Sequence, residues 1–161
     1  MKPIIAILMG SDSDAEMLKP CGETLREFGV PFTARVLSAH RTPRETVQFV
    51  EKAKDEGIEI FICAAGGAAH LAGVVAAHTE MPVIGIPVET PSFKGMDSLL
   101  STVQMPAGTP VATVGVGSGG VKNAAFLALR ILAMKDKKIE AALHDYKKKN
   151  IEKILKKTVD L

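Results

Sequence analysis

IIAILMGSDSDAE, residues 4–16, is the stretch from which the fold can be read. Residues 4–9 are an uninterrupted apolar run, which is typical of a strand buried on both faces of a parallel sheet. Ser13 and Glu16 have the spacing of a capping box, which predicts a helix from about Asp14 with Ser13 as its cap. A buried strand followed at once by a helix is the opening of a doubly wound α/β domain.

The same alternation continues along the chain. Further strands are predicted at about residues 32–37, 58–65, 82–86 and 111–116, and helices at about 14–28, 43–57, 96–103, 121–134 and 136–158, with a short helix beginning near 68 or 69. Thr42-Pro43-Arg44-Glu45 has the form of a second capping box. We therefore predict an α/β fold, a three-layer doubly wound parallel sheet of about five strands, flavodoxin-like, in a single domain over residues 1–161.

Composition excludes several classes of protein. Forty-seven per cent of the residues are hydrophobic, which is enough for a sizeable core and excludes a disordered chain. The net charge of +2 argues against a dedicated nucleic-acid binder, and we interpret the lysines near the C-terminus as the solvated face of a helix. No apolar segment approaches the ~20 residues that a membrane span needs, and the first run is too short for a signal peptide. We expect a soluble, cytoplasmic protein with no membrane partner.

The two cysteines and the last helix are less decisive. Cys21 and Cys63 cannot make a disulfide framework, and we interpret both as buried, inert thiols. The helix predicted in residues 136–161 is long for so small a sheet and carries an apolar stripe. It either packs on a neighbouring subunit or covers an edge of its own sheet, and the pattern alone leaves both open.

Polar, glycine-rich loops follow the first three predicted strands, at residues 10–14, 38–43 and 65–71. Ligands of open parallel sheets bind outside the carboxyl ends of the strands, so the fold brings these loops to one rim. In the first loop, Ser11 and Ser13 offer hydroxyl donors near a helix N-terminus, which suits a phosphate. Asp14 would repel a phosphate and fits ribose hydroxyls better. Simple helix capping explains Ser13 and Asp14 about as well.

The second loop is more specific. Arg41 is a bidentate donor suited to phosphate, and His40 beside it can give and take a proton near neutral pH. Ser38 and Thr42 add hydroxyls on either side. A lone histidine is more often structural, but this setting at a strand end favours a functional one.

The third loop offers backbone groups rather than side chains. Small residues leave room for a flat ring to lie against the main chain here, namely Gly66, Gly67, Ala68 and Ala69. His70 either faces the site or packs in the following helix, and the pattern does not decide between these. His78 and His144 have no polar loop around them, and we interpret both as structural.

Other chemistries leave no signature in this chain. No Cys/His cluster has zinc spacing, and there is neither a Walker lysine motif nor a dinucleotide-binding fingerprint after the first strand. The sequence therefore predicts no metal site and no nucleotide cofactor.

Taken together, the loops resemble the signature segments of the PurE family. The resemblance extends to PVIGIPV (82–88), GMDSLLS (95–101), VQMPAG (103–108) and KNAA (122–125), and so covers nearly the whole chain. The loop GGAAHL (66–71) resembles class I members, which are N5-carboxyaminoimidazole ribonucleotide mutases. The chain departs from the usual class I pattern at Cys63 to Ala65, at Ala72 and in the loop 115–120.

The resemblance implies an isomerase of purine biosynthesis that moves a carboxyl group within a ribonucleotide. It implies catalytic roles for His40, as general acid and base, and for His70, which helps to position the reacting group. The implied substrate-binding residues are Ser11, Ser13, Ser38 and Arg41 for the phosphate, Asp14 for the ribose, and Ala65, Gly66 and Gly67 along the imidazole and carboxylate.

The resemblance also implies that no metal, nucleotide or biotin cofactor is needed. The implied partners are the small-molecule ribonucleotide substrate and further copies of the chain in a homo-octamer. Whether the ATP-dependent N5-carboxyaminoimidazole ribonucleotide synthase hands over its unstable product directly is left open by the sequence.

Two other functions remain at this stage. One is the class II carboxylase, which has the same fold and uses free carbon dioxide; the loop around His70 argues against it. The other is a non-catalytic ribonucleotide-binding module, and the pair His40-Arg41 argues against that, because binding alone needs no titrating side chain beside the phosphate arginine.

Overall fold

The computed structural model describes residues 2–159, which form a parallel five-stranded sheet in the order β2-β1-β3-β4-β5. The strands are β1 Ile5–Met9, β2 Phe32–Val36, β3 Ile60–Gly66, β4 Val83–Val88 and β5 Ala112–Thr113. The helices are α1 Ala15–Glu27, α2 Pro43–Ala53, α3 Leu71–Ala77, α4 Met96–Val103, α5 Ser118–Ala133 and α6 Lys137–Leu155, with a single 3-10 turn at Asp12–Asp14. This is the predicted three-layer α/β fold of the flavodoxin-like kind.

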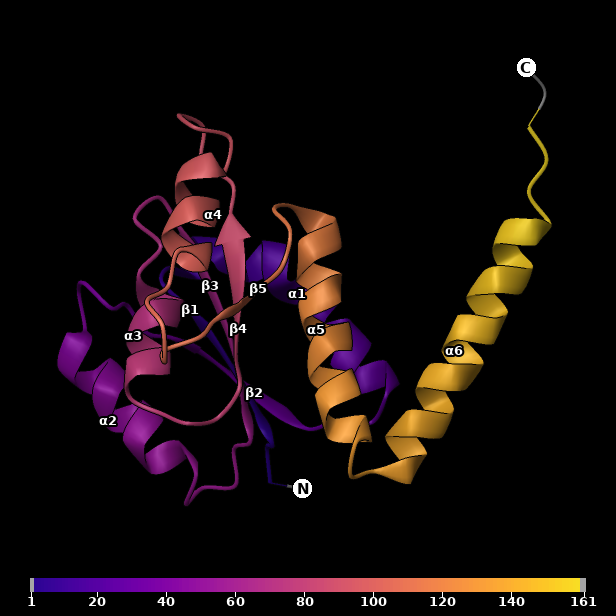
Figure 1. Ribbon diagram of the computed structural model, residues 1–161, viewed down its shortest axis with the longest axis horizontal. Coiled ribbons are helices and arrows are strands. Elements are labelled where there is room, and N and C mark those ends of the chain that lie inside the picture. The colour runs from indigo at the N-terminus through magenta and orange to yellow at the C-terminus, as the bar shows by residue number, and fades with distance from the viewer. Residues whose placement is uncertain (1, 160–161) are drawn as a thin grey trace.

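Helices cover both faces of the sheet, with α2, α3 and α4 on one side and α1 and α5 on the other (Figure 1). A hydrophobic core lies on each face of the sheet, and strand β1 contributes side chains to both. Ile5, Ile7 and Met9 pack towards α1 and α5. Ala6 and Leu8 pack towards α2 and α3. Each of these side chains is at most 6% exposed. The uninterrupted apolar run therefore marks a strand buried on both faces, as predicted.

Both predicted capping boxes are wrong. Ser11, not Ser13, caps the chain after β1, because a 3-10 turn precedes α1; its hydroxyl accepts a hydrogen bond from the amide of Ser13 at 3.3 Å. The Thr42 hydroxyl does not cap α2 either, since it accepts from the Ser38 amide at 2.9 Å and donates to the Ser38 carbonyl at 3.1 Å. Pro43 does occupy the first turn of α2.

Strand β5 is shorter than the predicted 111–116. Only Ala112 and Thr113 pair with β4, at the edge of the sheet. After β5 the chain turns back towards α5. In this turn the Gly115 carbonyl packs so closely against Gly120 of α5 that any side chain at residue 120 would collide with the carbonyl. The glycine-rich loop thus starts α5 three residues earlier than the pattern indicated.

Helix α6 packs on α5 through an aromatic cluster. Tyr146 lies 4.7 Å from Phe126 and 5.9 Å from Phe28, measured between ring centroids. Beyond this cluster α6 points away from the sheet (Figure 1), and Ile151, Ile154 and Leu155 are exposed. Within residues 2–159, no helix has both the length and the apolar character needed to cross a membrane.

The cysteines are buried, as predicted. Cys21 is 0% exposed in α1, and Cys63 is 1% exposed in β3. Burial raises the pKa of the Cys21 thiol to about 12 and raises that of Cys63 further in the same direction. Both are therefore protonated, unreactive thiols in the folded protein.

Candidate active site

The carboxyl ends of β1, β2 and β3 meet at one rim of the sheet around a pocket of about 340 Å³. The residues that line it come from the three loops, and they are Gly10, Ser11, Asp14, Ser38, Ala39, His40, Arg41, Ala65, Gly66, Ala68, His70 and Leu71. Of the residues predicted for the site, Ser13 and Gly67 do not line the pocket. The fold thus gathers the other predicted residues in one place.

The first loop presents Ser11 and Asp14 to the pocket. Ser13 stands behind Ser11 and donates its hydroxyl proton to the Ser11 hydroxyl at 2.8 Å. Burial raises the pKa of the Asp14 carboxyl above its ordinary value of 3.8. Three smaller influences lower this pKa: a hydrogen bond with the Ser13 side chain, one with the Ser11 backbone, and the positive charge of Arg41. A partly desolvated carboxyl group in this position is a good acceptor for sugar hydroxyls.

The second loop is held in shape by its own hydroxyl groups. The Ser38 carbonyl accepts hydrogen bonds from Thr42 and from the fully buried Thr46, while the Ser38 hydroxyl accepts one from the Arg41 amide at 3.2 Å. Thr42, which flanks His40 and Arg41 in the sequence, therefore shapes the loop instead of lining the pocket. The turn carries His40 and Arg41 at its tip.

Arg41 joins the second loop to the first. Its guanidinium donates a hydrogen bond to the carbonyl of Gly10, beside Ser11. The guanidinium and the hydroxyls of Ser11 and Ser38 are thus donors that line the same pocket. Such a set of donors suits the oxygens of a phosphate.

His40 and His70 are in direct contact with each other in the lining of the pocket. Nε2 of His40 lies 2.8 Å from Nδ1 of His70, and the two rings are nearly perpendicular, at 88°. A hydrogen bond at this distance requires that only one of the two facing nitrogens carries a proton. The structure therefore answers the question that the sequence left open, because His70 faces the site and bonds directly to the histidine of the second loop.

The third loop forms the floor beside the two histidines. Gly66 is the last residue of β3 and is exposed to the pocket, where it presents its backbone. Gly67 has a φ of +63°, a left-handed conformation that favours glycine, so it makes the turn towards His70. No group of three or more His, Cys, Asp or Glu side chains among residues 2–159 is arranged to hold a metal ion.

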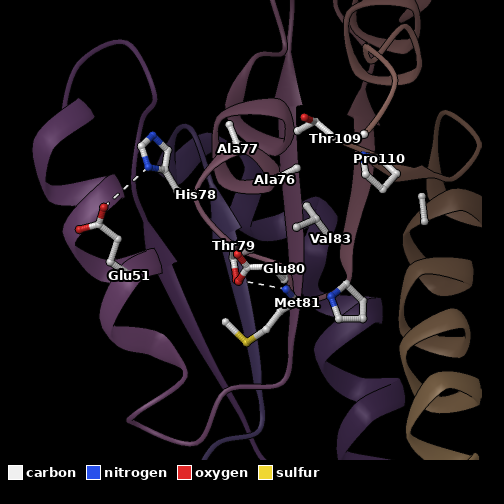
Figure 2. A pocket seen from close by; sticks show the side chains of 13 residues that line it. Glu51, Ala76, Ala77, His78, Thr79, Glu80, Met81, Val83, Thr109 and Pro110 are labelled. Atoms are coloured by element: carbon white, nitrogen blue, oxygen red, sulfur yellow. Dashed lines mark hydrogen bonds and ion pairs between the residues drawn. The ribbon is translucent and has the colours of Figure 1, made fainter.

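A larger hollow of about 770 Å³ lies at the opposite end of the sheet, where β4 and β5 begin. Figure 2 shows Glu51 reaching from α2 towards His78, and the carboxylate lies 3.7 Å from its Nδ1. Glu80 adds a second acidic side chain to the lining. This hollow is away from the carboxyl ends of the strands and its acidic groups would repel a phosphate, so we do not assign the substrate to it.

Comparison with known proteins places the chain in a family. Residues 4–153 match the model of the family described as AIR carboxylase. The chain belongs to the AIR carboxylase family. Two curated relatives are named N5-carboxyaminoimidazole ribonucleotide mutase: that of Pyrococcus horikoshii is 49% identical over 97% of this chain and 87% of its own length, and that of Bacillus subtilis is 44% identical over 100% of this chain and 99% of its own.

Solved structures of the AIR carboxylase family agree with the fold. The crystal structure of Treponema denticola PurE matches with a TM-score of 0.86 at 32% identity, covering 95% of this chain and 94% of that one. The resemblance inferred from the motifs is thus confirmed. Two lining residues, Ala39 and Leu71, were not predicted individually from the sequence. Their only signal in the sequence is their position next to the two histidines.

Proposed function

We propose that this protein is an N5-carboxyaminoimidazole ribonucleotide mutase of purine biosynthesis. It converts the carbamate ribonucleotide into 4-carboxy-5-aminoimidazole ribonucleotide. The observation that carries the proposal is the pair of His40 and His70, 2.8 Å apart in a pocket that also holds the phosphate-type donors. The names of the curated mutases, which are 44–49% identical to the chain, supply the reaction.

The pocket suggests how the substrate lies. Arg41, Ser11 and Ser38 take the phosphate, with Ser13 supporting Ser11 from behind, and Asp14 accepts hydrogen bonds from the ribose. The imidazole and its carboxylate then lie along the backbone of Ala65 and Gly66. Anchoring the remote phosphate holds the reacting ring beside the histidines, which lowers the entropic part of the barrier.

The proposed chemistry uses one histidine twice. The protonated His40 gives its proton to the carbamate nitrogen as the bond between that nitrogen and the carboxyl carbon breaks, releasing carbon dioxide. The nucleophilic ring carbon attacks the trapped carbon dioxide, and His40 removes the proton from that carbon, so the histidine ends as it began. His70 holds the ring of His40 in position through the hydrogen bond at 2.8 Å.

His40→Asn tests this proposal. Loss of general acid and base catalysis is expected to lower kcat by about 100-fold or more, while the Kd for the ribonucleotide changes little because the phosphate donors remain. His78→Asn is the matched control, since His78 lies in the other hollow and its replacement leaves kcat unchanged. Near-normal turnover by His40→Asn would show that His40 is not the proton carrier.

We also propose that the protein assembles as a homo-octamer in which α6 packs on a neighbouring subunit. The exposed apolar residues of α6 support this. A second exposed apolar stripe supports it too, formed by Met96, Leu100 and Val103 of α4 and by Phe93 in the turn before it. Light scattering tests it by measuring the mass in solution. A mass near 17.1 kDa, that of one chain, would contradict the proposal.

A further inference from the structure

The segment GMDSLLS, residues 95–101, starts α4 but contributes nothing to the lining of the pocket. Its first turn is bonded instead to the end of β4. The Thr90 hydroxyl donates to the Asp97 carboxylate, 3.0 Å from Oδ2 and 3.3 Å from Oδ1. The buried Ser98 hydroxyl donates to the Val88 carbonyl at 2.7 Å. The start of α4 therefore fixes the chain where it leaves β4.

The other side of the same segment lies against the floor of the pocket. Gly66 pairs with Val88 at the end of the ladder between β3 and β4. A methyl group on Gly66 would stand 3.2 Å from Cγ2 of Thr90 and 3.5 Å from both Cβ and the carbonyl oxygen of Val88. Thr90 thus touches Asp97 with its hydroxyl and lies directly behind Gly66 with its methyl group.

We propose that Thr90 and Asp97 are positioning residues, which hold the Gly66 backbone in place against the reacting ring of the substrate. This inference rests on the proposed mutase reaction. The β-branched side chain of Thr90 has few rotamers, and a charge-assisted hydrogen bond selects one of them. In that rotamer the methyl group backs Gly66. The Asp97 carboxylate is itself stabilised by its place in the first turn of α4.

Two substitutions at Thr90 separate its two contacts. Thr90→Val keeps the methyl wall and the shape but loses the hydroxyl donor, whereas Thr90→Ser keeps the donor and loses the methyl group. We expect Thr90→Val to lower kcat about tenfold and to leave KM nearly unchanged, because the phosphate and ribose contacts lie on the other two loops. Thr90→Ser should lower kcat as well, because it keeps the donor to Asp97 but loses the methyl group that lies against Gly66.

Thr24→Val is the matched control for stability. Thr24 is a buried threonine of α1 whose hydroxyl donates to the Pro20 carbonyl at 2.8 Å, remote from the three loops that line the pocket. It should lower the melting temperature about as much as Thr90→Val without a change in kcat. A second test uses Gly66→Ala, whose added methyl group meets Thr90 and slows turnover; adding Thr90→Ser should recover part of that loss.

Hydrogen exchange gives a readout that does not depend on activity. Thr90→Val should raise amide exchange in residues 66–70, and Thr24→Val should not. If wild type fails to turn over the carbamate ribonucleotide, the proposed function is wrong, yet the exchange result still decides whether Thr90 holds Gly66. Unchanged kcat and exchange in Thr90→Val, or an unchanged kcat in Thr90→Ser, would overturn the inference.

Discussion

The hydrogen bond between His40 and His70 makes a quantitative prediction about their replacement. His70→Leu keeps a side chain of similar size and removes Nδ1, the atom that lies 2.8 Å from Nε2 of His40. His70→Asn is the conservative partner, because its amide group can occupy about the place of that nitrogen. Both positions are exposed, so neither change should cost much stability.

The magnitude follows from the kind of contact. Because His40 is protonated at the start of the proposed cycle, its hydrogen bond to His70 is charge-assisted. Such a bond contributes about 1.5–3 kcal/mol net, which corresponds to about a 12- to 160-fold decrease in kcat for His70→Leu. Loss of His40 removes the proton carrier itself and is expected to cost about 100- to 10,000-fold. His70→Asn should lie between wild type and His70→Leu.

The double variant decides how His70 acts. If His70 acts only by holding the ring of His40, the variant lacking both histidines is no slower than His40→Asn alone. Steady-state kinetics of the two single variants and the double variant on the carbamate ribonucleotide complete this cycle. A double variant whose decrease equals the product of the single decreases would refute the reasoning, as would a His70→Leu variant as slow as His40→Asn.

Three further predictions concern stability and reactivity. Because burial raises the pKa of Asp14, folding favours its protonated form, and Asp14→Asn should have a higher melting temperature than wild type at about pH 7. This difference in melting temperature should vanish as the pH falls below 3.8. Thermal scans that show the same difference across this pH range would contradict the prediction. Cys21 and Cys63 should react with a thiol dye only as fast as the protein unfolds, and labelling of the native protein within seconds at mildly alkaline pH would disprove their burial. Gly120→Ala should lower the free energy of unfolding by about 2 kcal/mol or more, because its methyl group meets the Gly115 carbonyl. The methyl group of Gly119→Ala meets no neighbouring atom, so this variant is the control. Equal denaturant midpoints for the two variants would contradict that packing.

The features predicted well from the sequence are those set by local pattern. The apolar run of β1 specified a strand buried on both faces, and the alternation of strands and helices specified a parallel sheet, which by itself brings the loops with Ser11, His40 and Gly66 to one rim. The start of α4 at Met96 was also predicted correctly.

The features predicted poorly depend on contacts between distant segments. Whether Thr42 caps a helix or bonds to Ser38 depends on the path of the loop before it, and the spacing of residues does not reveal that path. The orientation of His70 likewise depends on His40, which is remote in sequence. Thr90 carries no motif of its own, and only its contacts with Gly66 and Asp97 reveal it.

The central claim is most directly tested by an ultraviolet assay of product formation from two substrates in parallel. One reaction contains N5-carboxyaminoimidazole ribonucleotide, and the other contains aminoimidazole ribonucleotide with a modest concentration of bicarbonate. We predict rapid turnover of the first and slow turnover of the second. Rapid turnover of the second alone would identify a carboxylase and contradict the mutase assignment, and turnover of neither, with the ribonucleotide still bound, would contradict any catalytic role.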